Sequence, residues 1–426
     1  MNLLSSKGTL HVEIRLKRSD QRLQSLRTSL DPIVSQYMQS AISVPQNVSF
    51  VPDLGLEVNS PLQQLVESFL VESDSGSNVT VKGAHKYCYH YYMAQRAEPS
   101  SGLGLFDSGS EGDGGDGLDS VVAANHVLLP ATQFIGLWEN LVYEDGLKEK
   151  LLKFALSALS FSQHEVDTNI ISCNRLILLH GPPGTGKTSL CKALAQKLSV
   201  RTQHTFAYTH LVEINSHSLF SKWFSESGKL VARLFTKIGE LVADRNNLVC
   251  VLIDEVESLA YARSAMSSNE PRDAMRVVNA VLTQLDDIKS CSNVLILATS
   301  NLAQSIDLAF LDRADIRQYI GYPAVSAIRS IYKTMLSELM NTGILQREAL
   351  EIEDAEEGLL TSLAERSVGL SGRTLRKLPL LAHARFTSGD LFEPNEKIGL
   401  SDFLDSMLLA LEHHLAEQHH LKHENI

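Results

Sequence analysis

The stretch GPPGTGKTSL at residues 181–190 restricts the possible folds more than any other part of the sequence. The apolar run RLILLH precedes it, and SLCKALAQKLSV follows with leucine and alanine at helical spacing. The order G-x-x-x-x-G-K-[ST] between a strand and a helix is typical of a loop that wraps a polyphosphate. Amides at the start of the helix favour an anion there. The residues predicted to bind a nucleotide are Gly181, Pro182, Pro183, Gly184, Thr185, Gly186, Lys187, Thr188 and Ser189.

The last residues of this loop have predicted roles of their own. Lys187 can reach the β- and γ-phosphates, and Thr188 can place its hydroxyl on Mg²⁺. A Gly-Pro turn with a stray lysine is the alternative, and the flanking strand and helix argue against it. The sequence therefore predicts a nucleotide site, with ATP and Mg²⁺ as the cofactors.

Two further apolar runs end in polar residues. LVCVLI at residues 248–253 leads into Asp254 and Glu255, and NVLILATS leads into Asn301. Ligands of open α/β sheets lie at the carboxyl ends of strands, so Asp254 can hold Mg²⁺ and Glu255 can act as general base. Asn301 can position the attacking water. The alternatives are acids at a solvated turn and an asparagine that caps a turn, and the order of the three motifs favours hydrolysis.

Two arginines follow in SIDLAFLDRADIRQYIGYP. Arg313 and Arg317 come after a short helical segment, beyond the strand edge. Arginines so placed can reach a neighbouring subunit's nucleotide and stabilise transition-state charge. For each arginine alone, a surface salt bridge is the alternative interpretation.

The pattern along the chain predicts four segments. Residues 1–98 form a small α+β domain, and residues 99–120, rich in glycine and acids, form a flexible linker. Strand and helix patterns alternate over residues 121–323, which predicts a parallel α/β sheet. Helical periodicity dominates residues 324–426. The expected fold class is therefore α/β, a P-loop ATPase domain followed by a helical lid.

The N-terminal segment carries no catalytic signature. TLHVEIRLKR alternates, with Leu10, Val12, Ile14 and Leu16 on one face, which predicts a half-buried strand with polar residues on the solvent face. A helix is expected after it, interrupted at Pro32. KYCYHYYMAQ resembles an aromatic strand that can stack bases, but it has few basic neighbours, which favours a structural strand.

The composition argues against two classes of binding partner, nucleic acids and membranes. A net charge of −12 over 426 residues argues against a general nucleic-acid coat. The five cysteines are scattered and form no C-x-x-C, which indicates reduced thiols inside the cell. No long apolar run and no signal-peptide core occur in the sequence. We therefore expect no direct nucleic-acid partner and no membrane partner.

Several segments together resemble one family. EINSHSLFSKWFSESGKLV, LIDEVESLAYAR, EPRDAMRVVNAVLTQLD, DRADIRQYIG and GLSGRTLRKLPLLAHA are similar to the pachytene checkpoint branch of the AAA+ ATPases. The resemblance covers about residues 124–390 and is weak before residue 100. It implies a homo-hexameric ring that remodels HORMA-domain proteins, with a HORMA-fold adaptor, by threading a segment through its pore. It also implies that the domain formed by residues 1–98 recognises substrate or adaptor.

The same resemblance assigns residues by motif. It places Lys187 and Thr188 in Walker A, Asp254 and Glu255 in Walker B, and Asn301 at sensor 1. Further assignments are the lid arginine of sensor 2, Arg373, and the pore loop, Lys222, Trp223 and Phe224. Most of the wider AAA group carries arginine where Asp312 stands, so we prefer Arg313 as the arginine finger and place Arg317 second.

Other functions stay open from the sequence. One alternative is a microtubule-severing AAA ATPase, which shares the Lys-Trp pore dipeptide. The GLSGR lid of this chain and its lack of a basic linker count against that alternative. An ATP-gated scaffold that scarcely hydrolyses is opposed by Glu255, Asn301 and the arginines. The resemblance implies roles in meiotic recombination and the spindle assembly checkpoint. It also implies a location in nucleus and cytoplasm, with chromosomes and kinetochores as more specific sites.

Overall fold

The computed structural model describes most of the chain, in segments. The described residues are 9–19, 21–41, 44–57, 60–73, 86–96, 124–143, 146–216, 227–258, 271–301, 306, 308–346, 354–386 and 398–424. The chain divides into two compact units. The first comprises Met1–Glu139, Asp145–His180 and Thr188–Tyr319, and the second comprises Asn140–Glu144, Gly181–Lys187 and Ile320–Ile426. The predicted acidic linker, residues 99–120, lies outside the described residues.

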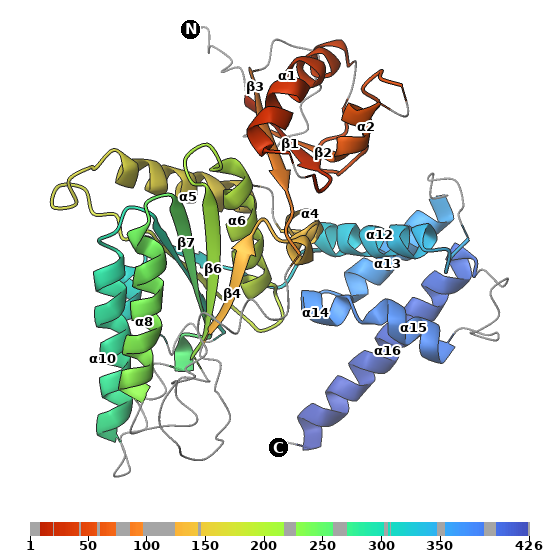
Figure 1. The fold of residues 1–426 in the computed structure, drawn as a ribbon. Helices are drawn as coiled ribbons and strands as arrows, with labels where there is room; N and C mark the ends of the chain where they lie inside the picture. The colour runs from red at the N-terminus through yellow and green to blue at the C-terminus, as the bar shows by residue number, and fades with distance from the viewer. Residues whose placement is uncertain are drawn as a thin grey trace, which may run out of the picture. The chain divides into compact units, whose positions relative to one another are not determined.

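The N-terminal part of the first unit is a three-stranded sheet with helices beside it (Figure 1). Its elements are β1 (Thr9–Leu16), α1 (Leu23–Ser40), α2 (Pro61–Leu65), β2 (Val66–Ser73) and β3 (Lys86–Met93). The central strand, β1, pairs antiparallel with β2 and parallel with β3. The predicted alternation in β1 is confirmed for its apolar face, because Leu10, Val12, Ile14 and Leu16 are all buried.

The predicted interruption at Pro32 is wrong, because α1 continues through this residue to Ser40. A proline inside a helix removes one backbone hydrogen bond and crowds the preceding turn. The buried residues Leu26, Leu30, Val34 and Met38 recur every four positions on both sides of the proline. They pack into one core with the sheet, and this tertiary packing outweighs the local cost.

The remainder of the first unit is built around a six-stranded sheet in the order β4-β6-β7-β8-β5-β9. Its strands are β4 (Ala124–Leu129), β5 (Leu176–His180), β6 (Tyr208–Asn215), β7 (Asn247–Asp254), β8 (Val294–Ser300) and β9 (Ile316–Tyr319). All neighbours pair in parallel except β4, which runs antiparallel to β6 at the edge. The α/β fold is thus confirmed, and the expectation of a purely parallel sheet is corrected at that edge.

The helical segments of this part are η1 (Thr132–Phe134), α4 (Leu137–Asn140), α5 (Leu147–Gln163), α6 (Lys187–Arg201), α8 (Ser227–Ala243), α10 (Pro271–Ile288) and α11 (Leu308–Arg313). Helices α8 and α10 pack against each other and share one apolar core with the sheet (Figure 1). Strands β7 and β8 are buried along their whole apolar length, as expected for parallel strands with both faces covered.

The second unit is helical. Its helices are α12 (Val325–Asn341), α13 (Asp354–Arg366), α14 (Gly372–Leu375), α15 (Leu378–Phe386) and α16 (Leu400–Glu424). They share one core, which includes the fully buried Tyr332, Phe403 and Met407. Val142, from the short segment before α5, packs against the same core. Among the described helices none has the length and apolar content needed to cross a bilayer.

Candidate active site

The phosphate loop follows β5 and ends where α6 begins. At Gly181 φ is +142°, and a Cβ there would lie 2.1 Å from the Ile320 carbonyl oxygen, so only glycine fits. Lys187 is 5% exposed, and its Nζ donates to the carbonyls of Gly181 and Pro182, each at 2.8 Å. The ammonium group is therefore held within the turn of the loop, where the sequence places the phosphate-binding charge.

The GLSGR motif of the lid contacts this loop within the second unit. The backbone N–H of Arg373 donates to the Gly184 carbonyl at 3.0 Å. Gly184 has φ +77°, and a Cβ there would lie 2.7 Å from Ser371 Oγ. Ser371 in turn caps α14 by accepting from the Thr374 N–H at 3.2 Å. The structure thus brings Arg373 beside the loop, and Ser371 is a neighbour that sequence reasoning missed.

Tyr143 is a second neighbour of the phosphate loop, and no sequence motif predicted it. Its hydroxyl lies 3.2 Å from the carbonyl oxygens of Thr185 and Gly186. A Cβ on Gly186 would lie 2.7 Å from that hydroxyl oxygen. Tyr143 therefore supports the loop from outside, and only the fold reveals it because 42 residues separate it from Thr185.

In the first unit, Asp254 lies at the carboxyl end of β7 and collects hydroxyl groups. Thr188 donates from Oγ1 to Asp254 Oδ1 at 2.7 Å, and Thr299 donates to the same oxygen. Ser216 donates to the Asp254 backbone carbonyl at 2.7 Å. Carboxylate and hydroxyl oxygens are ligands that suit Mg²⁺. Asp254 and Thr188 therefore fit the predicted metal role, and Thr299 is the partner that the sequence did not indicate.

Glu255 and Asn301 lie together at the same sheet edge. Because β7 and β8 are parallel neighbours, the residues after their ends meet, and Asn301 Nδ2 donates to Glu255 Oε1 at 3.3 Å. The Glu255 N–H donates to Thr299 Oγ1 at 3.2 Å, and the Asn301 N–H donates to Glu257 Oε1 at 3.0 Å. Glu255 is exposed. Its carboxylate, oriented by an amide, can accept a proton from water.

The structure separates the two candidate arginines. Arg313, at the end of α11, forms a two-pronged ion pair with Asp286, from Nε at 2.9 Å and from a terminal nitrogen at 2.7 Å. The hydrogen bond from Arg313 lowers the pKa of Asp286 to about 2. Arg317 is 49% exposed and lies 4.0 Å from Asp312. In this chain Arg313 is thus engaged by its own subunit, whereas Arg317 is the more exposed of the two.

The remaining predicted site residues are not in the described part of the chain. Lys222, Trp223 and Phe224, assigned to the pore loop, lie between residues 217 and 226, outside the described residues. Among the described residues no group of three or more histidine, cysteine or acidic side chains could hold a metal ion by itself. A metal at Asp254 would therefore depend on a phosphate ligand as well.

Two family models match the chain. Residues 177–322 match the ATPase family associated with various cellular activities, AAA. Residues 351–415 match the TRIP13-like, AAA+ ATPase lid C-terminal domain. The first range contains the phosphate loop, Asp254, Glu255 and Asn301, and the second contains Arg373. The chain is therefore an ATP-binding AAA+ ATPase.

Individual proteins and solved structures show which branch of the AAA+ ATPases this chain is similar to. The pachytene checkpoint protein 2 homolog of Danio rerio is 47% identical over 375 residues, 84% of each chain. The Homo sapiens homolog is 49% identical over 335 residues, 74% of this chain and 76% of its own. The C. elegans PCH-2 structure superimposes with a TM-score of 0.76 at 32% identity, over 96% of this chain and 99% of that one.

A more distant structure shares the fold. A chain of the E. coli MS115-1 HORMA:CdnC:Trip13 complex matches with a TM-score of 0.50 at 18% identity, over 66% of this chain and 93% of its own. Together, the identity to the vertebrate homologs, the lid model and the PCH-2 fold extend over most of the chain. The chain belongs to the pachytene checkpoint protein 2 family of AAA+ ATPases.

Proposed function

We propose that this ATPase remodels HORMA-domain proteins, recruited with a HORMA-fold adaptor, as a homo-hexamer that threads a segment through its pore. The observation that carries the proposal is the family-specific lid on the phosphate loop. The Arg373 N–H to Gly184 carbonyl bond couples the TRIP13-like lid to the nucleotide loop. A lid that rests on the loop can convert nucleotide turnover into movement. The E. coli structure that shares the fold is a complex that contains a HORMA protein.

In the proposed chemistry Lys187 would bind the phosphates. Thr188 and Asp254 would hold Mg²⁺, which would supply charge neutralisation at the phosphates. Glu255 accepts the proton of the attacking water, and Asn301 orients Glu255 through the 3.3 Å contact. Arg313 or Arg317 acts on the nucleotide of the next subunit. For Arg313, this role requires release from Asp286.

The proposal extends to the cell. We place the protein in nucleus and cytoplasm, at chromosomes and kinetochores, in meiotic recombination and spindle assembly checkpoint control. Fluorescence microscopy of the tagged full chain in meiotic and mitotic cells tests this assignment. Exclusion from chromosomes at every stage would overturn it.

A trap variant tests the biochemical function. Glu255→Gln keeps the shape of the side chain but cannot accept the proton, so we expect ATP turnover to fall about 100-fold or more. The variant should retain ATP and accumulate as hexamers that hold a HORMA-domain protein, measured by light scattering and affinity capture. Glu240→Gln, on an exposed side chain of α8, is the control and should turn over normally.

The two parts of this proposal fail separately. Turnover of Glu255→Gln within a few-fold of the unaltered protein would contradict the assigned base. If Glu255→Gln loses turnover as expected but captures no HORMA-domain protein, even with adaptor present, the assigned substrate class is contradicted. Turnover and capture are therefore measured on the same preparation.

A further inference from the structure

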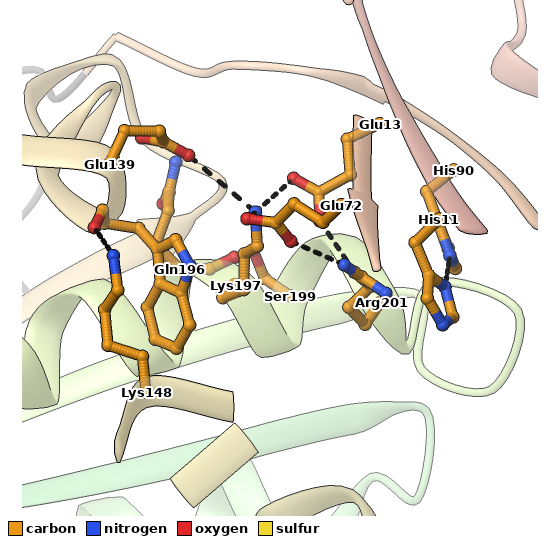
Figure 2. A network of polar contacts seen from close by, with 11 residues as sticks. His11, Glu13, Glu72, His90, Glu139, Lys148, Gln196, Lys197, Ser199 and Arg201 are labelled. Atoms are coloured by element: carbon orange, nitrogen blue, oxygen red, sulfur yellow. Dashed lines mark hydrogen bonds and ion pairs between the residues drawn. The ribbon is translucent and has the colours of Figure 1, made fainter. Parts of the chain in front are cut away.

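A ring of buried charges joins the N-terminal sheet to helix α6 (Figure 2). Lys197 Nζ lies 2.8 Å from Glu13 Oε2 and 2.9 Å from Glu72 Oε1. Arg201 pairs with Glu13 Oε1 at 2.6 Å and with Glu72 Oε2 at 2.7 Å. Each carboxylate therefore bridges both cations. We call these four side chains, Glu13, Glu72, Lys197 and Arg201, the clasp.

The clasp is closed to solvent. The side chains of Lys197 and Glu13 are each 3% exposed, that of Arg201 is 5% exposed and that of Glu72 is 12% exposed. Burial alone would raise the pKa of Glu13, but Lys197 and Arg201 outweigh it and lower that pKa. Burial would likewise lower the pKa of Lys197, yet the attached carboxylates raise it. Glu13 and Lys197 thus each favour the charged form of the other.

Such a ring holds only when it is complete. Taking a charge out of water is costly, and a buried pair that loses one partner leaves an uncompensated charge. Both carboxylates of the clasp belong to the N-terminal sheet, on β1 and β2, and both cations belong to α6. On the side of α6, Glu139 lies 3.7 Å from Lys197 and balances part of the positive charge, and the shorter ion pairs all come from the N-terminal sheet. The N-terminal sheet and α6 are therefore matched to each other by charge.

A second contact links the same pair of regions at one point of the chain. The Gln95 N–H donates to the Pro130 carbonyl at 2.8 Å, and the Thr132 N–H donates to the Gln95 carbonyl at 2.8 Å. The side chain of Gln196 on α6 then binds both the N–H and the carbonyl of Ala131, at 2.9 and 3.2 Å. The chain leaving β3 is thus hydrogen-bonded to a segment that α6 also binds. This contact is independent of the clasp.

Helix α6 also reaches the candidate active site. Its second residue is Thr188, which binds Asp254 at 2.7 Å. Lys197 follows nine residues later, about 14 Å along the helix at 1.5 Å per residue. A helix of this length transmits a displacement of one end to the other. One helix thus carries both Thr188, which is predicted to bind Mg²⁺, and the two cations that contact the N-terminal sheet.

We propose that Lys197 and Arg201 are positioning residues that fix the N-terminal domain to α6, so that the domain moves with this helix during the nucleotide cycle. The inference rests on the proposed function and on the expectation that the N-terminal domain recognises substrate or adaptor. The orientation of the recruited protein is then set by α6, through the clasp. A flexible tether would leave that orientation open.

Two variants of the clasp test the positioning role. The half variant carries two substitutions and the fourfold variant carries four. Glu13→Gln with Glu72→Gln removes both carboxylates of the clasp. Arg201 then loses both of its ion pairs, and Lys197 keeps only its longer contact with Glu139, at 3.7 Å. Adding Lys197→Met and Arg201→Met replaces the whole ring by uncharged side chains of similar length, a change that buried ion networks often tolerate. Lys192→Met is the matched control, because Lys192 lies on the same helix and pairs with Glu213 at 2.7 Å, away from the N-terminal sheet.

The first readout is a distance. Spin labels are placed at Val51→Cys and Ile170→Cys, which are 72% and 80% exposed, after Cys88, Cys173 and Cys291 are changed to serine. Labelled subunits are diluted with unlabelled ones. We expect one narrow distance distribution in the unaltered clasp, with ADP and with ATP alike, and in the fourfold variant. The half variant should give a broad distribution.

The second readout is conversion of a HORMA-domain protein with adaptor present. The half variant should keep basal ATP hydrolysis, because both changes lie outside the nucleotide site. Its maximal rate of conversion should fall at least about 10-fold, since misplacement of a substrate is costly, and the fourfold variant should recover. A lowered maximal rate with unchanged basal hydrolysis separates positioning from a loss of fold.

Each failure has a distinct meaning. A narrow distribution in the half variant would overturn the clasp, and a distribution that broadens with ATP in the unaltered protein would overturn movement as one body. A broad distribution with unchanged conversion would overturn the positioning role. If the unaltered protein converts no HORMA-domain protein, the proposed function falls, and the distances still decide whether the domain follows α6.

Discussion

The two ends of α6 use charged and polar side chains in opposite ways. At its start, Thr188 meets Asp254, a half-buried carboxylate beside the exposed Glu255. Near its end, Lys197 and Arg201 are buried and meet Glu13 and Glu72 in a closed ring. The two carboxylates at the sheet edge keep access to solvent, whereas the clasp satisfies its members internally. The contrast holds for the carboxylates and not for Lys187, which is 5% exposed and bonded to loop carbonyls.

The clasp end should respond most strongly to loss of a charge. Arg201→Met leaves Glu13 and Glu72 with one cation between them, so we expect the free energy of unfolding to fall by about 3–5 kcal/mol. Chemical denaturation at one protein concentration measures it. Lys192→Met, whose ion pair with Glu213 is about a quarter exposed, should cost about 1 kcal/mol or less. Equal losses in the two variants would remove the contrast between the ends.

The start of α6 should respond in activity and not in stability. Asp254→Asn weakens an oxygen ligand for Mg²⁺, so we expect turnover to fall about 100-fold, which is about 2.7 kcal/mol on the barrier. The free energy of unfolding should change far less than in Arg201→Met. Turnover is measured over a range of Mg²⁺ concentrations. Full activity at ordinary Mg²⁺ would contradict the metal role, and a collapse of stability would make Asp254 a structural residue.

Histidines beside the clasp add a smaller, pH-dependent effect. His11 Nδ1 and His90 Nε2 lie 2.9 Å apart in stacked rings, near Arg201 (Figure 2). Burial, with Arg201, His11, His204 and Lys197, lowers the pKa of His90 to about 2. Below pH 6.5 the unfolded chain binds a proton that the folded chain does not, so stability falls as pH falls. For one histidine the loss is about 1.2 kcal/mol between pH 6 and pH 5.

Removing this titration provides the check. His90→Gln should flatten the dependence of the unfolding free energy on pH over that window, which lies above the range where carboxylates titrate. His126, whose pKa burial and His210 lower to about 4, should keep a residual slope in the variant. An unchanged slope in His90→Gln would mean that the pair beside the clasp does not titrate on unfolding.

The sequence indicated one end of α6 and missed the other. Lys187, Asp254, Glu255 and Asn301 stand at fixed places in local motifs, so their neighbourhood could be expected from strand order alone. Thr299 was missed because a hydroxyl inside an apolar run carries no signal of its own. Glu13 was assigned to a solvent face, because strict alternation in β1 describes one sheet and says nothing about a helix packed on its other face.

Other misses have the same origin. The antiparallel direction of β4 depends on pairing with β6, which lies about 80 residues later. The continuation of α1 through Pro32 depends on packing against the sheet. In each case a contact distant in sequence overrides the local pattern. What the motifs predict well is the part of the molecule in which chemistry requires a fixed local spacing.

The backbone of Glu255 is left-handed, with φ +56°. This conformation costs a residue with a side chain about 1 kcal/mol or more. Hydrogen bonds from Glu255 and Val256 to Thr299 hold it there. A glycine would relax this turn and make the chain more stable, but it would lack the carboxylate. Selection for durability alone would therefore favour an inert protein, and the glutamate marks a position where activity opposes stability.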